Sequence, residues 1–203
     1  MSALPQYGKH LHPTETMHAV VIDRYGAADQ LRPTTVPRPV PTRGQVLVRT
    51  RFIGVNPKDV IVRKGKFKVA TGKKFPLLVG HDIAGEVVEA APGADLAVGQ
   101  QVFGMINDFA GRAYAEYAAV DAQSLCAVPT SVDLRTAAAV PLAAQTALQG
   151  LRDDARVTRG QRVLINGASG GVGVFAVQIA KLLGAEVTAV CSARNAELVR
   201  SLG

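Results

Sequence analysis

Up to about residue 130, apolar residues come in short runs in which apolar and polar positions partly alternate, a pattern typical of half-buried β-strands. We expect strands over residues 18–23, 46–53, 83–90, 101–106 and 113–120. Prolines exclude the stretch 35–45 from a central strand, because proline cannot donate to a sheet ladder. Pro92-Gly93 marks a turn after the third strand. The spacing of these runs predicts a small barrel-like β domain.

One helix signal interrupts the strands. Asn56 can cap the N-terminus of a helix, and Pro57 suits the first helical position. Asp59 lies in the first turn, where a carboxylate is favourable, and Gly65 can end the helix. On these local grounds alone, Asn56 is most simply a helix cap.

The pattern changes at about residue 133, where alanine-rich and continuous apolar stretches replace the alternation. The expected elements are a helix at 137–148, a strand at 162–166, a helix at 172–183, a strand at 186–190 and a helix from Asn195. The first of these strands is apolar throughout its core, which is typical of a strand buried on both faces. Strand, glycine turn, helix and strand form a βαβ unit. The chain as a whole is therefore expected to be α/β, with a βαβ unit of the kind that builds doubly wound parallel Rossmann domains.

The composition is that of a globular protein, with 48% apolar, 19% charged and 5% aromatic residues in 203, which excludes intrinsic disorder and fibrous repeats. Every apolar run is shorter than the ~20 residues that span a bilayer. Cys126 and Cys191 lie far apart, which excludes a disulfide scaffold and a cysteine-rich zinc site. We expect a cytoplasmic protein with no membrane partner.

The net charge of +7 is concentrated in the first 80 residues, which hold 14 Lys and Arg against 4 Asp and Glu. The segment 63–74 alone carries Arg63 and five lysines. Clustered cations of this kind can bind nucleic acid. The simpler interpretation is a solvated loop, or one that faces an anionic cofactor, because no aromatic platform or nucleic-acid motif accompanies the charge.

A glycine cluster follows the strand at 162–166 and opens the next helix. Its residues are Gly167, Ala168, Ser169, Gly170, Gly171, Val172 and Gly173. The spacing is a variant of the dinucleotide fingerprint, in which glycine lets the backbone approach a pyrophosphate at a helix N-terminus. A glycine-rich turn without a ligand is the simpler alternative. The complete βαβ context favours nucleotide binding.

The end of the second strand distinguishes between the two nicotinamide cofactors. NAD enzymes usually place an acid there to bind the ribose 2′-hydroxyl, whereas this chain has Ser192, Arg194 and Asn195. A hydroxyl and a guanidinium suit the 2′-phosphate of NADPH. The alternative is that Ser192 caps the next helix and that Arg194 is solvated.

Five segments together resemble the zinc-independent members of the medium-chain dehydrogenase/reductase superfamily, and among them the quinone oxidoreductases of the zeta-crystallin type. These are GVNPKD (54–59), GHDIAGEVVEA (80–90), VFG (102–104), AAAVPLAAQTAL (137–148) and GASGGVG (167–173). The resemblance implies a GroES-like catalytic domain over residues 17–132 and a partial Rossmann domain over 133–203, with NADPH in the cleft between them. It also implies that residues 1–16 are a disordered extension.

The resemblance assigns roles to individual residues. Asn56 matches the asparagine that contacts the nicotinamide ribose and lines the substrate pocket, and Asp59 is a nearby acid of the same motif, so these two are the catalytic candidates. Thr146 matches the threonine near the nicotinamide. The glycine turn would hold the pyrophosphate, and Ser192, Arg194 and Asn195 would form the adenosine-phosphate pocket.

Zinc-using relatives place a cysteine near position 56 and a histidine-acid pair at His81 and Asp82. This chain has Asn56 and keeps His81 without a thiolate partner, so three protein ligands cannot be assembled. We expect no metal, and we expect His81 to be structural.

Without a Lewis acid, hydride transfer to an acceptor that is already conjugated is easier than oxidation of a simple alcohol. We therefore expect NADPH-dependent reduction of a quinone or an enone-type double bond. The alternatives are a truncated, non-catalytic nucleotide- or RNA-binding protein and, with less support, an alcohol dehydrogenase. We expect a dimer for the full-length form. After Arg162 there is room for only two of the six strands of a Rossmann sheet, so we expect weak turnover by the 203-residue chain alone.

Overall fold

The computed structural model describes residues 11–203, with side chains from Glu15 onward. The chain divides into two compact units, one that ends at Pro141 and one that spans Leu142–Gly203, and each is described by itself. The sequence places the boundary between residues 132 and 133. Among the described residues, no helix is long and apolar enough to cross a membrane.

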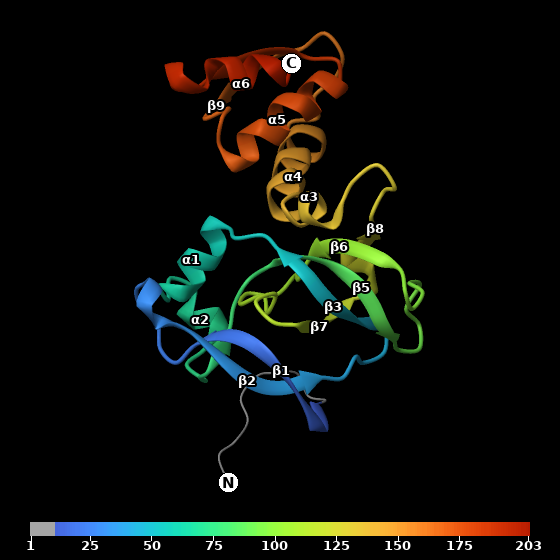
Figure 1. Cartoon of the computed structure of the whole chain (residues 1–203). Helices are drawn as coiled ribbons and strands as arrows, with labels where there is room; N and C mark the ends of the chain where they lie inside the picture. Colours follow the sequence, from blue (N-terminus) through green and yellow to red (C-terminus); the bar gives the residue numbers. More distant parts are fainter. Residues whose placement is uncertain (1–10) are drawn as a thin grey trace. The chain divides into compact units, whose positions relative to one another are not determined.

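The first unit is built from two antiparallel sheets (Figure 1). One has the order β2-β1-β4, and the other has the order β7-β3-β5-β6-β8. The strands are β1 (Leu11–Ile22), β2 (Leu31–Pro39), β3 (Gln45–Ile53), β4 (Leu77–Leu78), β5 (Asp82–Ala90), β6 (Gln101–Met105), β7 (Tyr117–Asp121) and β8 (Leu125–Ala127). The core of the larger sheet is aliphatic and includes Val46, Val48, Ile83 and Val102, which are fully buried.

The predicted strands agree with the structure except over residues 113–120, and the sequence pattern did not predict β2, β4 or β8. The proline-rich stretch forms part of β2, which is an edge strand, so its prolines remove no ladder bond from a sheet interior. The expected strand 113–120 begins only at Tyr117, because the backbone N–H groups of Ala113 and Tyr114 donate to the carbonyl oxygens of Gly80 and Val79 instead of entering the ladder.

The expectation of a disordered extension over residues 1–16 is wrong for its last part. Leu11–Thr16 belong to β1, where Leu11 pairs with Pro39 and Thr16 with Pro37 on either side of an irregularity in the register. Glu15 in this segment also pairs with Arg38. Residues 1–10 of the expected extension lie outside the described residues.

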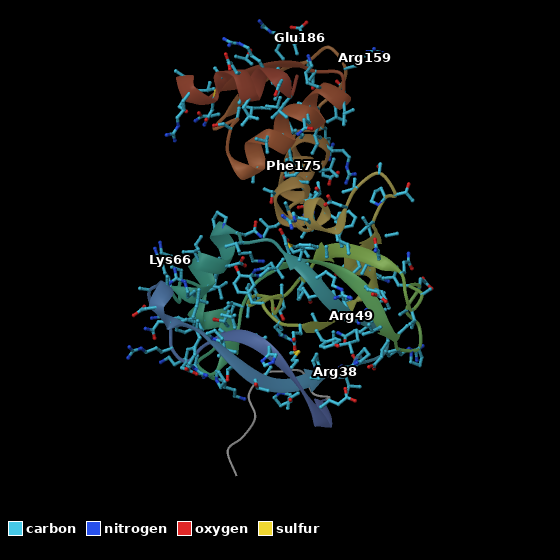
Figure 2. The ribbon with its side chains drawn as sticks, viewed as in Figure 1. Arg38, Arg49, Lys66, Arg159, Phe175 and Glu186 are labelled. Atoms are coloured by element: carbon cyan, nitrogen blue, oxygen red, sulfur yellow. The ribbon has the colours of Figure 1, made fainter. Side chains whose placement is uncertain are left out.

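Two arginines on the surface of this unit connect neighbouring strands (Figure 2). Arg38 of β2 pairs with Glu15 of β1 and Glu89 of β5, and so connects the two sheets. Arg49 of β3 pairs with Glu86 of the adjacent β5 at 2.7 Å. Partly exposed ion pairs of this kind contribute about 1 kcal/mol or less each, so the aliphatic core carries most of the stability.

Short helices connect the strands of the first unit. They are η1 (Ala28–Gln30), α1 (Pro57–Arg63), α2 (Lys68–Thr71), η2 (Ala122–Ser124) and α3 (Leu134–Ala138). Helix α1 begins at Pro57 after the cap residue Asn56, as the sequence predicts, and Gly65 follows it with a φ of +74°. The single helix expected over 137–148 is instead two, α3 and α4 (Pro141–Leu148), because a proline disfavours helical geometry in the residue before it.

The second unit contains the βαβ unit. After α4 come η3 (Gln149–Asp154), β9 (Arg162–Asn166), α5 (Gly171–Leu182), β10 (Glu186–Val190), η4 (Ala193–Asn195) and α6 (Ala196–Ser201). Strands β9 and β10 are parallel, in a register that pairs Arg162 with Glu186 and Asn166 with Val190. Parallel neighbours need a crossover, which α5 provides.

Only one face of this small sheet is covered. Ile165 packs in a cluster with Val177 and Ala180 of α5, whereas Leu164, which faces the other way, is 68% exposed. The expectation that residues 162–166 are buried on both faces is therefore wrong within the described chain. An apolar run predicts the strand correctly, but covering its second face requires a further layer.

Candidate functional site

The first unit holds a buried cluster of polar side chains around the N-terminus of α1. Its members are Asn56, Asp59, His81, Asp82 and Tyr114. Asp59, His81 and Asp82 are at most 3% exposed, although such groups are rarely buried unless they are paired. The residues come from the start of α1, the start of β5 and the segment before β7.

Asp59 is the centre of the cluster because its carboxylate accepts three hydrogen bonds. The backbone N–H of Asn56 donates to Oδ2 at 2.8 Å, and the Tyr114 hydroxyl donates to the same oxygen at 3.0 Å. His81 Nδ1 lies 2.5 Å from Oδ1. Burial first, and then the nearby Asp59 carboxylate, raise the pKa of Tyr114 well above its usual range, so this phenol keeps its proton and remains a donor.

Both ring nitrogens of His81 have partners within the chain. Nδ1 contacts Asp59, and Nε2 lies 3.2 Å from the carbonyl oxygen of Asp108. The ring is fully buried, as expected for a structural histidine. Among the side chains that the structure describes, from Glu15 onward, no three His, Cys, Asp or Glu are grouped so that they could hold a metal ion.

Asn56 is more than the helix cap that local reasoning suggests. Its backbone N–H bonds to Asp59, which completes one arm of a capping arrangement, and its side-chain Nδ2 donates to Asp82 Oδ2 at 2.9 Å. The side chain is half-buried, between the buried carboxylates and solvent. Sequence reasoning missed the partner roles of Asp82 and Tyr114. Tyr114 is 55 positions from Asp59 and carries no local signal.

The glycine turn of the second unit lies where the sequence places it, between β9 and α5. Gly167 has a φ of +74°, a backbone conformation that residues with a side chain rarely adopt. Gly170 is the N-cap residue of α5. A Cβ on Gly173 would lie 2.3 Å from the carbonyl oxygen of Gly167, so only glycine allows the helix to approach the turn this closely. The first N–H groups of α5 have no partner within the helix, and this exposed, positive end is suited to a pyrophosphate.

The loop after β10 contacts the glycine turn directly. Asn195 Nδ2 donates to Ser169 Oγ at 3.0 Å, and the backbone N–H of Ala168 donates to the carbonyl oxygen of Val190. These bonds bring together the two segments that the sequence assigns to one cofactor. Ser192 and Arg194 are exposed beside them, so their polar groups are accessible to a phosphate.

Thr146 lies on α4, and the neighbouring Ala147 belongs to the same buried cluster as Ala168 of the glycine turn. The side chain of Thr146 is exposed, and its hydroxyl donates to the carbonyl oxygen of Leu142 at 2.7 Å. A threonine hydroxyl bonded in this way keeps acceptor capacity for a ligand.

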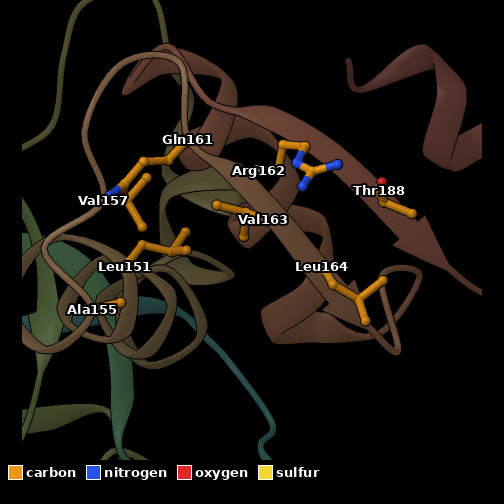
Figure 3. A pocket seen from close by; sticks show the side chains of 8 residues that line it. All are labelled: Leu151, Ala155, Val157, Gln161, Arg162, Val163, Leu164 and Thr188. Carbon is orange, nitrogen blue, oxygen red and sulfur yellow. The ribbon is translucent and has the colours of Figure 1, made fainter.

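A cavity of about 750 Å³ opens on the uncovered face of the β9–β10 sheet (Figure 3). Leu151, Val157 and Leu164 provide apolar lining, and Arg162 and Thr188 lie at its strand side. None of the predicted site residues lines this cavity. The cavity lies there because no described segment covers this face of the sheet, and it is separate from the glycine turn.

Comparisons with known proteins agree with this architecture. The alcohol dehydrogenase GroES-like domain matches residues 42–130. The chloroplast envelope quinone oxidoreductase homolog of Arabidopsis thaliana is 38% identical over 194 residues, which are 92% of this chain and 59% of that protein. The chain spans about three fifths of the length of this relative.

Two solved structures are similar throughout the described fold. The quinone oxidoreductase from Coxiella burnetii has a TM-score of 0.84 at 30% identity and covers 93% of this chain, which covers 61% of it. A mycobacterial protein solved in complex with NADPH has a TM-score of 0.79 at 32% identity, and the match covers 92% of this chain and 56% of that one.

Proposed function

Because the chain belongs to the quinone oxidoreductase group of the medium-chain dehydrogenase/reductase superfamily, we propose that it takes part in NADPH-dependent reduction of a quinone or an enone-type double bond. The observation that carries the proposal is the glycine turn, whose close approach to α5 tolerates no side chain at Gly173. When bound, NADPH would supply a hydride from its nicotinamide ring. The tasks of the protein are to bind the cofactor, orient it and exclude water.

Each proposed binding residue presents chemistry that suits its task. The residues from Gly167 to Gly173 would hold the pyrophosphate through backbone N–H groups at the start of α5. Arg194 and Ser192 would bind the 2′-phosphate, which favours NADPH over NADH. Asn56 and Thr146 would contact the nicotinamide end of the cofactor. Asp59 would hold Asn56 in place, because its carboxylate accepts from the backbone N–H of Asn56.

Zinc independence is part of the proposal, and the contacts of His81 support it. Its two ring nitrogens are engaged by Asp59 and the carbonyl of Asp108, and the amide of Asn56 is engaged by Asp82. An acceptor made electrophilic by conjugation needs no Lewis acid. A stoichiometric zinc in elemental analysis of the purified chain would contradict this part of the proposal.

The cofactor preference is tested with Arg194→Glu. We expect the unmodified chain to bind NADPH more tightly than NADH, and the variant to lose about 10- to 100-fold in NADPH affinity with little change for NADH, because a charge-assisted phosphate contact is worth about 1.5–3 kcal/mol. Arg200→Glu makes the same charge change on exposed α6 and is the control. Equal affinities of the unmodified chain for the two cofactors would contradict the assignment.

The reaction is tested by following NADPH oxidation with a panel of quinones and enones and, for comparison, of simple aldehydes. Turnover with the conjugated acceptors and not with the aldehydes is the expected pattern, at the weak level expected for the 203-residue chain alone. Reduction of the aldehydes alone would favour the alcohol dehydrogenase alternative.

Cytoplasmic location stays a prediction, since the Arabidopsis relative is named for the chloroplast envelope.

A further inference from the structure

Asn56 and Asp82 meet because of the register between β3 and β5. Ile53 at the end of β3 pairs with Ile83, and the backbone N–H of the next residue, Gly54, donates to the carbonyl oxygen of Asp82 at 3.2 Å. The chain then turns into α1, and Asn56 arrives beside the Asp82 side chain. The register of the sheet therefore brings Asn56 beside Asp82.

The space for the Asp82 carboxylate depends on Gly54. A Cβ at Gly54 would lie 2.9 Å from Asp82 Cβ and 3.0 Å from Oδ2, and 2.8 Å from the carbonyl oxygen of Ala138. Asp82 is 1% exposed, so its carboxylate is held among protein groups and cannot reorient freely. A buried carboxylate in this position requires a donor.

A primary amide can rotate by half a turn and exchange its oxygen and nitrogen, and the two orientations offer different chemistry to a ligand. An ionised carboxylate accepts hydrogen bonds and does not donate them. Asp82 Oδ2, which is 2.9 Å from Asn56 Nδ2, therefore selects one of the two orientations. The amide nitrogen faces the carboxylate, and the oxygen is on the other branch of the planar group.

We propose that Asp82 is a positioning residue that fixes the Asn56 amide, so that the site offers the amide oxygen as an acceptor to a hydroxyl of the cofactor ribose. Asp82 acts through Asn56 and does not itself contact the cofactor. This inference rests on the proposed function, because it takes Asn56 as the residue that contacts the nicotinamide ribose. The inference gives the carboxylate of Asp82, which follows His81 in the sequence, a role that does not involve a metal.

The orientation is tested first without cofactor, on the 203-residue chain labelled with ¹³C and ¹⁵N. Nuclear magnetic resonance should detect a scalar coupling across the hydrogen bond between Asn56 ¹⁵Nδ2 and Asp82 ¹³Cγ. This coupling cannot arise from the flipped amide. Absence of this coupling would overturn the inference, and the test needs no variant because it uses the unmodified protein.

The variant Asp82→Asn then tests the consequence for binding. An asparagine at this position can donate or accept, so it no longer selects an orientation. We therefore expect a weaker coupling from Asn56 ¹⁵Nδ2 to ¹³Cγ of residue 82, and an NADPH dissociation constant raised about 3- to 10-fold, the effect of one hydrogen bond. Asp121→Asn is the matched control, because Asp121 Oδ1 accepts from Gln45 Nε2 at 3.0 Å in an exposed carboxylate–amide pair. It should change neither quantity.

Failure of this inference is distinguishable from failure of the proposed function. If NADPH shifts the backbone signals of Gly170 to Gly173 but leaves those of Asn56 unchanged, the cofactor binds and the inferred ribose contact is wrong. If NADPH shifts neither set while the coupling is present, the proposed function fails, and with it the role in cofactor binding, although the amide is fixed. Unchanged NADPH affinity in Asp82→Asn with a weakened coupling would also overturn the positioning role.

Discussion

At the scale of single residues, the three hydrogen bonds to Asp59 predict a large effect of a small change. Asp59→Asn keeps the shape of the side chain but removes the negative charge of the carboxylate, which accepts hydrogen bonds from Asn56, His81 and Tyr114. We expect the free energy of unfolding to fall by about 2–4 kcal/mol. Urea unfolding followed by circular dichroism measures it. Asp95→Asn, at an exposed position, should change it by about 0.5 kcal/mol or less. Equal losses in both variants would contradict a central role for Asp59.

Tyr114 predicts a dependence on alkaline pH. Burial and Asp59 raise the pKa of this phenol in the folded protein, whereas in the unfolded chain the same phenol has a pKa of about 10. The folded state therefore retains a proton that the unfolded state loses, and the stabilisation present below pH ~10 declines as pH rises above it. Tyr114→Phe should be less stable than the wild type at pH 7 by about 1 kcal/mol, the worth of its bond to Asp59, and this gap should narrow above pH ~10.

The measurement is the free energy of unfolding of both proteins from pH 7 to 11. Tyr117→Phe leaves Tyr114 in place and should keep the wild-type slope. A gap between Tyr114→Phe and wild type that stays constant across this range would show that the Tyr114 phenol ionises alike in the folded and unfolded chain.

At the scale of elements, the turn between β9 and α5 predicts a contrast between two glycines. Gly173→Ala would place a Cβ 2.3 Å from the carbonyl oxygen of Gly167 and 2.7 Å from backbone atoms of Ala168, and backbone cannot move aside as a flexible side chain can. We expect a loss of about 1–3 kcal/mol in the free energy of unfolding, together with weaker NADPH binding. Gly171→Ala meets no atom within 4 Å, and alanine favours the helix, so it should be neutral or stabilising. Similar losses in both variants, measured by urea unfolding, would contradict the packing argument.

At the scale of the whole molecule, the uncovered face of the β9–β10 sheet predicts self-association. Leu164 is 68% exposed and lies with Leu151 and Val157 around the cavity of Figure 3. A contiguous apolar surface favours association, so sedimentation velocity should show a weight-average mass that rises with concentration and falls in Leu164→Glu. Leu182→Glu is the control, because Leu182 is 86% exposed on α5 and does not line the cavity. A mass independent of concentration in the wild type would contradict the prediction.

The sequence by itself determined the elements whose signals are local. Asn56 and Pro57 start α1, the glycines from Gly167 to Gly173 form the turn before α5, and β9, α5 and β10 lie within a few residues of their predicted bounds. Caps, turns and the periodicity of a helix depend on residues within about one turn along the chain, so they can be predicted from the sequence. The α/β class and the placement of the glycine turn follow from them.

Only the tertiary structure decided which residues meet. Asp59 contacts His81 across 22 positions and Tyr114 across 55, and the register of β3 against β5 places Asn56 beside Asp82. The exposure of Leu164 was likewise not predictable from the sequence, because the apolar run around it is typical of a fully buried strand. Sequence patterns report how each residue partitions between water and an apolar interior, whereas strand register and sheet layering set the distances between residues far apart in the chain. The polar cluster beneath Asn56 therefore exists only in the folded protein.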